Sequence, residues 1–327
     1  MSLRRVVLVS ATLFIFTIAA QRPGATFLLI PPSAKATAMA YAYTAICNDA
    51  STNYYNAAGL AFFKSPKITV DYCGYLNGLA PDMHYFYCGF TYPLATSAWG
   101  FDIMYYTPGT IELRNFEGVY LGSYRIWRLA LKLNYSRRFS KKLSLGIGWK
   151  YIKQQYGLWD SWGWYGDETG SSWAFDFNLL YKILPNLSIG TVLHNIGPKI
   201  KYSDDPLPWT YRLGIAYKPV DTKNFSCAFS AEITKILIGM FAIEENSFWE
   251  NFKYEWDTAW KGIGIELLFY KVVSLRGGYF YDEEGARKGL TFGGGIKLVN
   301  FELDIGIDEN IFEFETQDRK ISLSYTF

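Results

Sequence analysis

The chain has 327 residues, a formal net charge of +2 and a mean hydropathy of zero. So small a net charge gives no reason to expect a nucleic-acid partner, and no apolar stretch beyond the first twenty residues is long enough for a transmembrane helix. Aromatic residues make up 19% of the chain and glycine contributes 29 residues, a composition that suits strands whose two faces meet lipid and water.

The first twenty residues have the pattern of a secretory signal peptide. Arg4 and Arg5 form a short basic start, residues 6–18 form an apolar run, and small residues occupy positions 19 and 20. The apolar run of about 13 residues is too short to span a bilayer comfortably. We therefore predict that residues 1–20 are a cleaved signal peptide rather than an uncleaved anchor, and that the mature chain is exported.

Residues 21–66 differ from the rest of the mature chain. An alanine-rich stretch over residues 34–45 favours a short helix, and small residues recur at residues 56–61. The segment is too rich in small residues to span lipid and too apolar to be a free tail. A barrel of about fourteen strands is too wide to be filled by its own side chains. We therefore predict that residues 21–66 form a plug inside a barrel; the alternative is a periplasmic extension.

Residues 67–327 are predicted to form that barrel, because strand-like segments with alternating apolar and polar positions recur along them. Trp173, Phe175 and Phe177, for example, share one face of a strand, and small or polar residues occupy the other. The same alternation recurs over residues 143–151, 211–217, 263–269 and 301–308. A soluble sandwich also alternates, with its apolar face in a core, so periodicity alone leaves both architectures open.

Loop lengths separate the two architectures. Short connections are predicted at residues 140–141, 184–185, 220–223, 270–271 and 299–300. Long connections are predicted over residues 107–123, 156–170, 196–207, 235–257 and 309–319. Tight turns at one rim and long loops at the other are typical of an outer-membrane barrel, whereas a sandwich has no reason to alternate so regularly. The predicted fold is all-β, a transmembrane antiparallel β-barrel of about fourteen strands.

The last strand supports this architecture. Residues 321–327 alternate up to the final Phe327, and Tyr325 is the aromatic residue two positions before it. A strand of this kind looks like the C-terminal signal that the outer-membrane assembly machinery of bacteria recognises. We therefore predict that Tyr325 and Phe327 act as an assembly signal and that the chain resides in a bacterial outer membrane, in contact with its lipid.

Residues capable of chemistry are few. The four cysteines, Cys47, Cys73, Cys88 and Cys227, show no metal-binding spacing; a disulfide between Cys73 and Cys88 on neighbouring strands and isolated thiols are both open. His194 is one of two histidines, and alternation places it on the predicted lumen face, away from any outward serine that could complete a Ser-His pair. We predict no catalytic residues, no metal site and no cofactor.

Charged residues also recur on the predicted lumen face, with both signs represented. They are Asp102, Lys132, Asp176, Arg212, Glu266, Arg276, Lys297 and Asp304. A hydrated, salt-bridged interior explains this mixture. A channel for apolar solutes would need a more apolar lining than these strands provide.

Two of the long connections are rich in aromatic residues. Those of interest are Trp159, Trp162, Trp164, Phe248, Trp249 and Trp256. Rigid aromatic side chains are suited to protein recognition; the alternatives are a girdle at the outer lipid interface and packing between the loops. The hypothesis is that these six residues dock an exported protein.

Short motifs are spread over most of the mature chain. They lie at residues 27–30, 34–36, 39–40, 45, 48–50 and 55–60, with less specific ones at residues 194–197, 274–279 and 290–297. Together they resemble the signature of PorV/PorQ-type proteins, which belong to the wider FadL-like group of outer-membrane barrels. The chain departs from the family at Lys35, Ala40 and Ala57, where Arg, Gly and Pro are usual. PorV-like members can carry Ala at the last of these positions, so this departure leans towards PorV.

The resemblance implies a hatch and two alternative functions. The implied hatch residues are Asn48, Asp49, Asn56, Ala57, Ala58 and Gly59. PorV-like members work in type IX secretion, where they bind exported protein cargo and hand it to a surface attachment complex. FadL-like members transport hydrophobic small molecules across the outer membrane. The leading prediction is the PorV-like role and the alternative is FadL-like transport; a purely architectural barrel would do neither.

Overall fold

The computed structural model describes residues 22–77, 82–115, 117–160, 163–240, 247–285, 287–309 and 317–327. For residues 77, 111, 113, 157–160, 163–168 and 317 the description is of the backbone alone. The predicted signal peptide, residues 1–20, lies outside the described residues, and so does Trp162.

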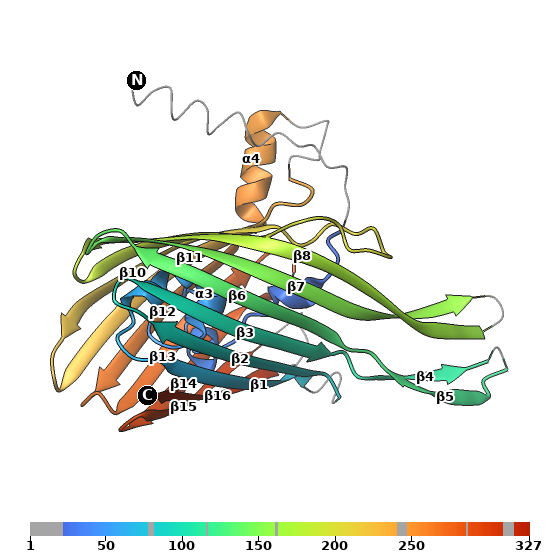
Figure 1. Ribbon diagram of the computed structural model, residues 1–327, viewed down its shortest axis with the longest axis horizontal. Helices are drawn as coiled ribbons and strands as arrows, with labels where there is room; N and C mark the ends of the chain where they lie inside the picture. The colour runs from blue at the N-terminus through green and yellow to red at the C-terminus, as the bar shows by residue number, and fades with distance from the viewer. Residues whose placement is uncertain are drawn as a thin grey trace.

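Within the described residues, fourteen strands close into one antiparallel barrel (Figure 1). They are β1 (Lys67–Asn77), β2 (His84–Pro93), β3 (Ser97–Thr107), β6 (Arg128–Arg138), β7 (Leu143–Asp160), β8 (Gly163–Leu184), β9 (Leu187–Ile196), β10 (Thr210–Asp221), β11 (Phe225–Ile236), β12 (Trp260–Phe269), β13 (Val273–Asp282), β14 (Arg287–Leu298), β15 (Phe301–Glu309) and β16 (Gln317–Thr326). Strand β1 closes the ring against β16, so the main-chain groups of both end strands are paired. The prediction of an all-β barrel of about fourteen antiparallel strands is confirmed.

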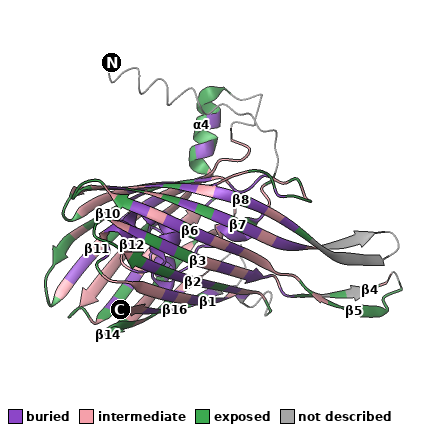
Figure 2. Cartoon of the chain, viewed as in Figure 1, coloured by how far each residue is buried: buried purple, intermediate pink, exposed green. Residues whose placement is uncertain are grey.

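The barrel wall is apolar on its outer face and polar on its inner face. On β8, Trp173 and Phe177 are exposed on the outside, whereas Asp176 between them is buried in the lumen. Figure 2 shows the same alternation of exposed and buried residues along the other strands. An outer wall covered by large apolar side chains is typical of a barrel surrounded by lipid. Among the described residues, no helix is both long and apolar enough to cross a membrane.

The two rims of the barrel differ. At one rim, the short-turn end, strands are joined by tight turns, and Lys67 pairs with Thr326, so the chain enters and leaves the barrel there. At the opposite rim, the long-loop end, most of the connections are longer. The connection between β11 and β12 contains helix α4 (Phe248–Asp257), whose start is fixed by a capping box between Ser247 and Glu250.

Two of the predicted long loops contain hairpins. Strands β4 (Thr110–Arg114) and β5 (Tyr120–Arg125) form a separate two-stranded sheet between β3 and β6. Strands β7 and β8 remain paired as far as Asp160 and Gly163, so the prediction of a loop over residues 156–170 was wrong. Pairing with the facing strand decides where a strand ends, and that pairing is not visible in the residues of one segment. Both hairpins project beyond the other strands (Figure 1).

Residues 22–66, the N-terminal segment, lie inside the lumen (Figure 1). The segment consists of the short helices η1 (Thr26–Leu29), α2 (Ala34–Ala38), α3 (Thr52–Tyr55) and η2 (Ala57–Phe62). Ser33 caps α2, and the Asn56 side chain caps η2 by accepting from the Ala58 N–H. Helices this short are not stable alone, so contacts with the wall must hold them in place.

All four cysteines are free thiols. In the register of β1 and β2, Cys73 lies opposite Tyr85 and Cys88 lies opposite Val70. Cys88 therefore lies on the same face as Val70, and Val70 is three positions before Cys73 on β1. Because successive side chains of a strand alternate between its faces, the two thiols point to opposite faces of the wall. Of the two options that the sequence left open, the structure has isolated thiols.

Candidate functional site

The contact between the N-terminal segment and the barrel wall contains much of the buried polar chemistry of the described residues. The Ala34 N–H donates to Ser322 Oγ on β16 at 2.7 Å, and the Ala57 N–H donates to Asn178 Oδ1 on β8 at 3.0 Å. Strands β16 and β8 lie on roughly opposite sides of the ring. The segment is therefore attached across the whole width of the lumen.

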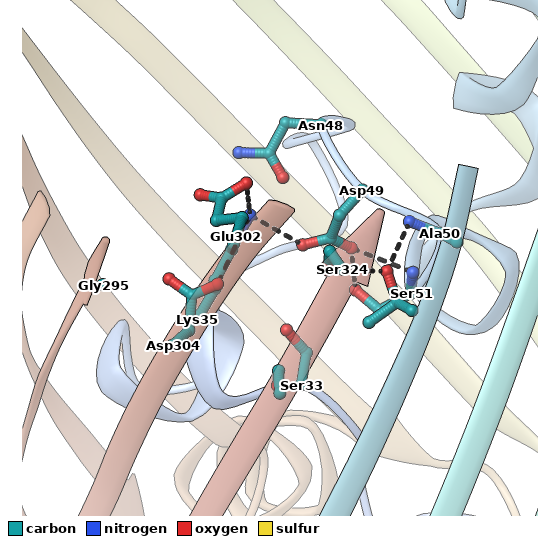
Figure 3. A network of polar contacts seen from close by, with 12 residues as sticks. Ser33, Lys35, Asn48, Asp49, Ala50, Ser51, Gly295, Glu302, Asp304 and Ser324 are labelled. Atoms are coloured by element: carbon teal, nitrogen blue, oxygen red, sulfur yellow. Dashed lines mark hydrogen bonds and ion pairs between the residues drawn. The ribbon is translucent and has the colours of Figure 1, made fainter. Parts of the chain in front are cut away.

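Lys35 of α2 is at the centre of an ionic cluster (Figure 3). Its Nζ lies 2.9 Å from Glu302 Oε2, 3.4 Å from Asp49 Oδ2 and 3.7 Å from Asp304 Oδ2. On the wall, Arg276 Nη1 lies 2.7 Å from Asp304 Oδ1. Burial alone would lower the pKa of Lys35, but Asp304 and the other two carboxylates raise it above its usual value. Lys35 therefore stays charged in a buried position.

Asp49 holds the same cluster to the later part of the segment. Its carboxylate accepts from the Ser51 N–H at 2.9 Å and from the Tyr43 hydroxyl at 3.2 Å. Burial alone would raise the pKa of Asp49, but the Lys35 ammonium and the hydrogen bonds from Ser51 hold it below the usual value. The negative charge of Asp49 is thus balanced by Lys35 and by its hydrogen-bond donors inside the N-terminal segment.

A second anchor lies on β10 and β11. Glu232 accepts from the backbone N–H groups of Tyr43 and Thr44 at 2.9 and 2.8 Å. Arg212 donates to the same carboxylate at 2.6 Å, and its guanidinium lies 4.9 Å from the ring centre of Tyr55. One ion pair on the wall thus holds two separate parts of the segment.

A third cluster surrounds Asp176 on β8. Its Oδ2 lies 2.7 Å from Lys132 Nζ, 3.3 Å from Lys150 Nζ and 3.1 Å from His194 Nδ1. Lys132 also donates to the Asn53 carbonyl of the N-terminal segment at 2.7 Å. The salt-bridged lumen that the sequence predicted is confirmed at this cluster, and His194 belongs to it instead of facing a serine on the outer wall.

Glycines on the inner wall allow the segment to approach the strands closely. A Cβ on Gly306 would lie 2.1 Å from the Ala34 carbonyl oxygen, and a Cβ on Gly262 would lie 2.2 Å from that of Ala40. Real side chains do not make contacts this short. These two positions therefore admit only glycine as long as the segment stays where it is.

The implied hatch residues form one continuous part of this contact. The Asn56 side-chain amide donates to the carbonyls of Thr44 and Leu179 at 2.9 and 3.0 Å. Ser144 on β7 donates to the Ala58 carbonyl at 2.7 Å. Asn48 and Asp49 both lie beside the Tyr43 hydroxyl, and a Cβ on Gly59 would overlap the Cys47 sulfur. The described contacts thus bind these six residues to the wall or to other residues of the N-terminal segment.

Two cavities lie on either side of the N-terminal segment. The cavity at the long-loop end has a volume of about 330 Å³, and Phe27, Tyr41 and Trp260 are among its lining residues. The cavity at the short-turn end has a volume of about 220 Å³ and is lined by residues such as Cys47 and Lys182. The two cavities share no lining residue among those described. The segment separates them.

The six residues predicted to dock cargo fall into two groups. Trp159 and Trp164 belong to the projecting part of β7 and β8, where the backbone alone is described, and Trp162 between these strands lies outside the described residues. The second group consists of Phe248, Trp249 and Trp256, which are exposed on α4. Among the described residues, the two groups thus belong to different elements, the β7–β8 hairpin and helix α4.

Sequence reasoning did not include Glu232 and Lys150 among the charged lumen residues that it named. The alternation of their strands could have placed both on the lumen face, because Glu232 shares a face with Ser230 and Thr234, and Lys150 shares one with Gly148. Their partners in the N-terminal segment and in β8 were not predictable, since long-range pairing inside a barrel depends on its closure.

A comparison with protein-family models finds one described as "Type IX secretion system protein PorV", which matches residues 17–242. No curated protein matches the sequence. Among solved structures, the Ralstonia pickettii toluene transporter TbuX is similar, with a TM-score of 0.59, 13% identity, and coverage of 90% of this chain and 98% of that one.

Two further structures have the same degree of similarity. The Pseudomonas putida toluene transporter TodX has a TM-score of 0.59 at 11% identity, covering 90% of this chain and 97% of its own. The CymD monoaromatic hydrocarbon channel has a TM-score of 0.59 at 12% identity, covering 91% and 98%. At such low identity these likenesses concern the fold alone, the closed antiparallel barrel.

Proposed function

The chain belongs to the PorV family of type IX secretion system proteins, and on this premise we propose that it binds exported protein cargo at the outer surface and hands it to a surface attachment complex. In outer-membrane barrels the short turns face the periplasm and the long loops face outwards. The long-loop end is therefore the end at which exported cargo would be met.

The observation that carries this proposal is the filled lumen. The N-terminal segment is tied to opposite sides of the wall and separates the two cavities. A barrel filled in this way is suited to acting through its outer surface, because its interior offers little free path to a solute. Charged clusters around Lys35 and Asp176 make the interior polar as well.

The proposed docking element is the projecting β7–β8 hairpin. Strands β7 and β8 have 18 and 22 residues, whereas the other barrel strands have 9 to 12. The hairpin sequence contains Trp159, Trp162 and Trp164, and rigid aromatic residues dominate protein recognition surfaces. Cargo bound there would be held away from the lipid, since this hairpin projects beyond the other barrel strands at the long-loop end (Figure 1).

Replacing Trp159, Trp162 and Trp164 together by Ala in the full chain tests this docking. The measurement is the amount of exported protein that co-purifies with the barrel from outer membranes. We expect normal barrel assembly and a several-fold loss of co-purified cargo. A matched control replaces Val119, Tyr120 and Leu121 by Ala, which are exposed on the other hairpin; it should keep its cargo. Undiminished cargo with the tryptophan variant would contradict the proposal.

The alternative, FadL-like transport of hydrophobic small molecules, has one observation in its favour. Aromatic residues, including Phe27, Tyr41 and Trp260, line part of the long-loop cavity. Arg128 and Asp318 line the same cavity, which makes it less suited to apolar solutes. Measuring toluene uptake by cells with and without the chain separates the functions, because uptake that depends on the chain would support transport.

A further inference from the structure

Helix α4 has one exposed aromatic face. Phe248, Trp249, Phe252 and Trp256 are 64%, 74%, 48% and 52% exposed. Positions i, i+1, i+4 and i+8 fall within about 100° of one another around a helix. We refer to these four residues as the aromatic face. Large aromatic side chains gathered and exposed in this way need an apolar neighbour.

The other sides of α4 are mostly polar, with Tyr254, which is 42% exposed, as the one aromatic residue among them. Glu250, Lys253 and Asp257 are exposed away from the aromatic face, and Asn251 and Glu255 are buried towards the rest of the protein. A helix with aromatic residues on one side and charges on the other, and with little overall hydrophobicity, is typical of a segment that lies along a membrane interface.

Contacts at its end attach α4 to the outer face of the wall. Lys235 of β11 lies 2.5 Å from Glu255 Oε2 and donates to Thr258 Oγ1 at 2.6 Å. Lys261 of β12 lies 5.7 Å from the Trp256 ring centre. Lys261 points outwards, since its neighbour Gly262 faces the lumen against Ala40. Figure 1 accordingly shows α4 projecting sideways from the barrel wall.

Trp256 and Lys261 lie where the apolar outer wall ends. The next outward row towards the short-turn end contains Ile263 and Leu290, which are exposed and apolar. Tyr281 lies opposite Lys261 on β13, and the Lys261 ammonium is 5.3 Å from the centre of the Tyr281 ring. Aromatic residues at the edge of an apolar belt mark the membrane–water interface. Through Trp256, which lies beside Lys261, the aromatic face meets the edge of this belt.

We propose that α4 is an interfacial anchor, with its aromatic face embedded in the lipid of the outer leaflet. Lipid is favoured over a docked protein because the helix is attached to the lipid-facing side of the wall and meets the edge of its apolar belt. Embedding would bury Phe252 and Trp256 at the boundary between headgroups and acyl chains, and would leave Lys253 in water.

A pair of fluorescent labels tests the proposal in the full chain. Phe252→Cys and Lys253→Cys are prepared with the four native cysteines replaced by Ala, labelled, and reconstituted in vesicles of phosphatidylethanolamine and phosphatidylglycerol. A nitroxide-labelled phospholipid and aqueous iodide are then used as quenchers. The label at 252 should be quenched several-fold more by the lipid nitroxide than the label at 253, and iodide should show the reverse order.

A second measurement avoids the cysteine replacements. The change in fluorescence between the natural chain and a Trp249→Phe, Trp256→Phe variant isolates the signal of the two α4 tryptophans, and brominated lipid should quench that signal. Equal access of iodide to both labels, or no effect of brominated lipid, would overturn the proposal. Shielding of position 252 that develops only when an exported protein is added would overturn it too, and would assign α4 to cargo docking.

Discussion

Lys35 of α2 and Glu302 of β15 meet at the boundary between the N-terminal segment and the barrel wall, with 2.9 Å between Nζ and Oε2. Their side chains are 3% and 20% exposed, so the pair is largely withdrawn from water. A buried ion pair is stable only while its partners are all present, because an uncompensated buried charge is costly. The contact therefore joins the N-terminal segment to the penultimate strand of the barrel, β15.

Replacing Lys35 by Met should destabilise the folded barrel. The substitution leaves Asp49, Glu302 and Asp304 close together without their shared cation, and the loss of one partner from such a buried group costs about 3–5 kcal/mol. The measurement is the temperature at which the detergent-resistant barrel unfolds on a gel. Lys64→Met is the matched control, since Lys64 is an exposed lysine of the same segment. Equal melting temperatures for the two variants would contradict this account.

Gly306→Ala should loosen the N-terminal segment. The added methyl group would overlap the Ala34 carbonyl oxygen at 2.1 Å, and overpacking of this kind costs about 1–3 kcal/mol. Gly277→Ala is the control, because its Cβ would lie 3.9 Å from the Thr291 oxygen and causes no overlap. Limited proteolysis of the folded barrel should cut within residues 22–66 faster in Gly306→Ala. Identical cleavage rates would show that the close approach of Ala34 to Gly306 does not contribute to the stability of the segment.

Acid should weaken the contact between the segment and the wall. The folded-state pKa of Asp49 is held below 3.8, its usual value, so its stabilising contribution is complete above that pH and is lost as the pH falls through the folded-state pKa. Unfolding temperatures measured from about pH 6 to pH 3 should fall at the acid end. In Asp49→Asn, which cannot titrate, the fall should be smaller, and a curve parallel to that of the natural chain would refute the assignment.

Oxidation should not join Cys73 to Cys88, because the two thiols lie on opposite faces of the wall. Val70→Cys places a second thiol directly opposite Cys88 on the outer face, where facing Cβ atoms are about 4.5–5.5 Å apart. Treatment with an oxidant should then form a disulfide in this variant alone, detected by a shift on a non-reducing gel. A disulfide in the natural chain would require a different register of β1 and β2.

Most of the fold could be predicted from the alternation of apolar and polar residues along single strands. Trp173 and Phe177 were placed on one face and Asp176 on the other from period two alone, and the structure has these faces outside and inside. Loop lengths then distinguished a barrel from a sandwich. Both signals are local, since each strand presents its own faces whatever its partners are.

The contents of the lumen were only partly predictable. Mixed charges such as Lys132 and Asp176 indicated a salt-bridged interior, but their pairing and the role of Glu232 depend on which strands face one another after closure. The length of β7 and β8 and the position of α4 also escaped prediction. A hairpin is extended by its partner strand, and helix α4 is placed by outward lysines of neighbouring strands.

The sequence by itself determined that this protein is a lipid-facing barrel of antiparallel strands, because alternation with a period of two gives each strand one apolar face and one polar face. Tertiary structure alone decided how the N-terminal segment is held, for Lys35 and Glu302 are 267 positions apart and meet only after the ring has closed. Closure sets the width of the lumen, and that width decides which distant charges come within reach of one another.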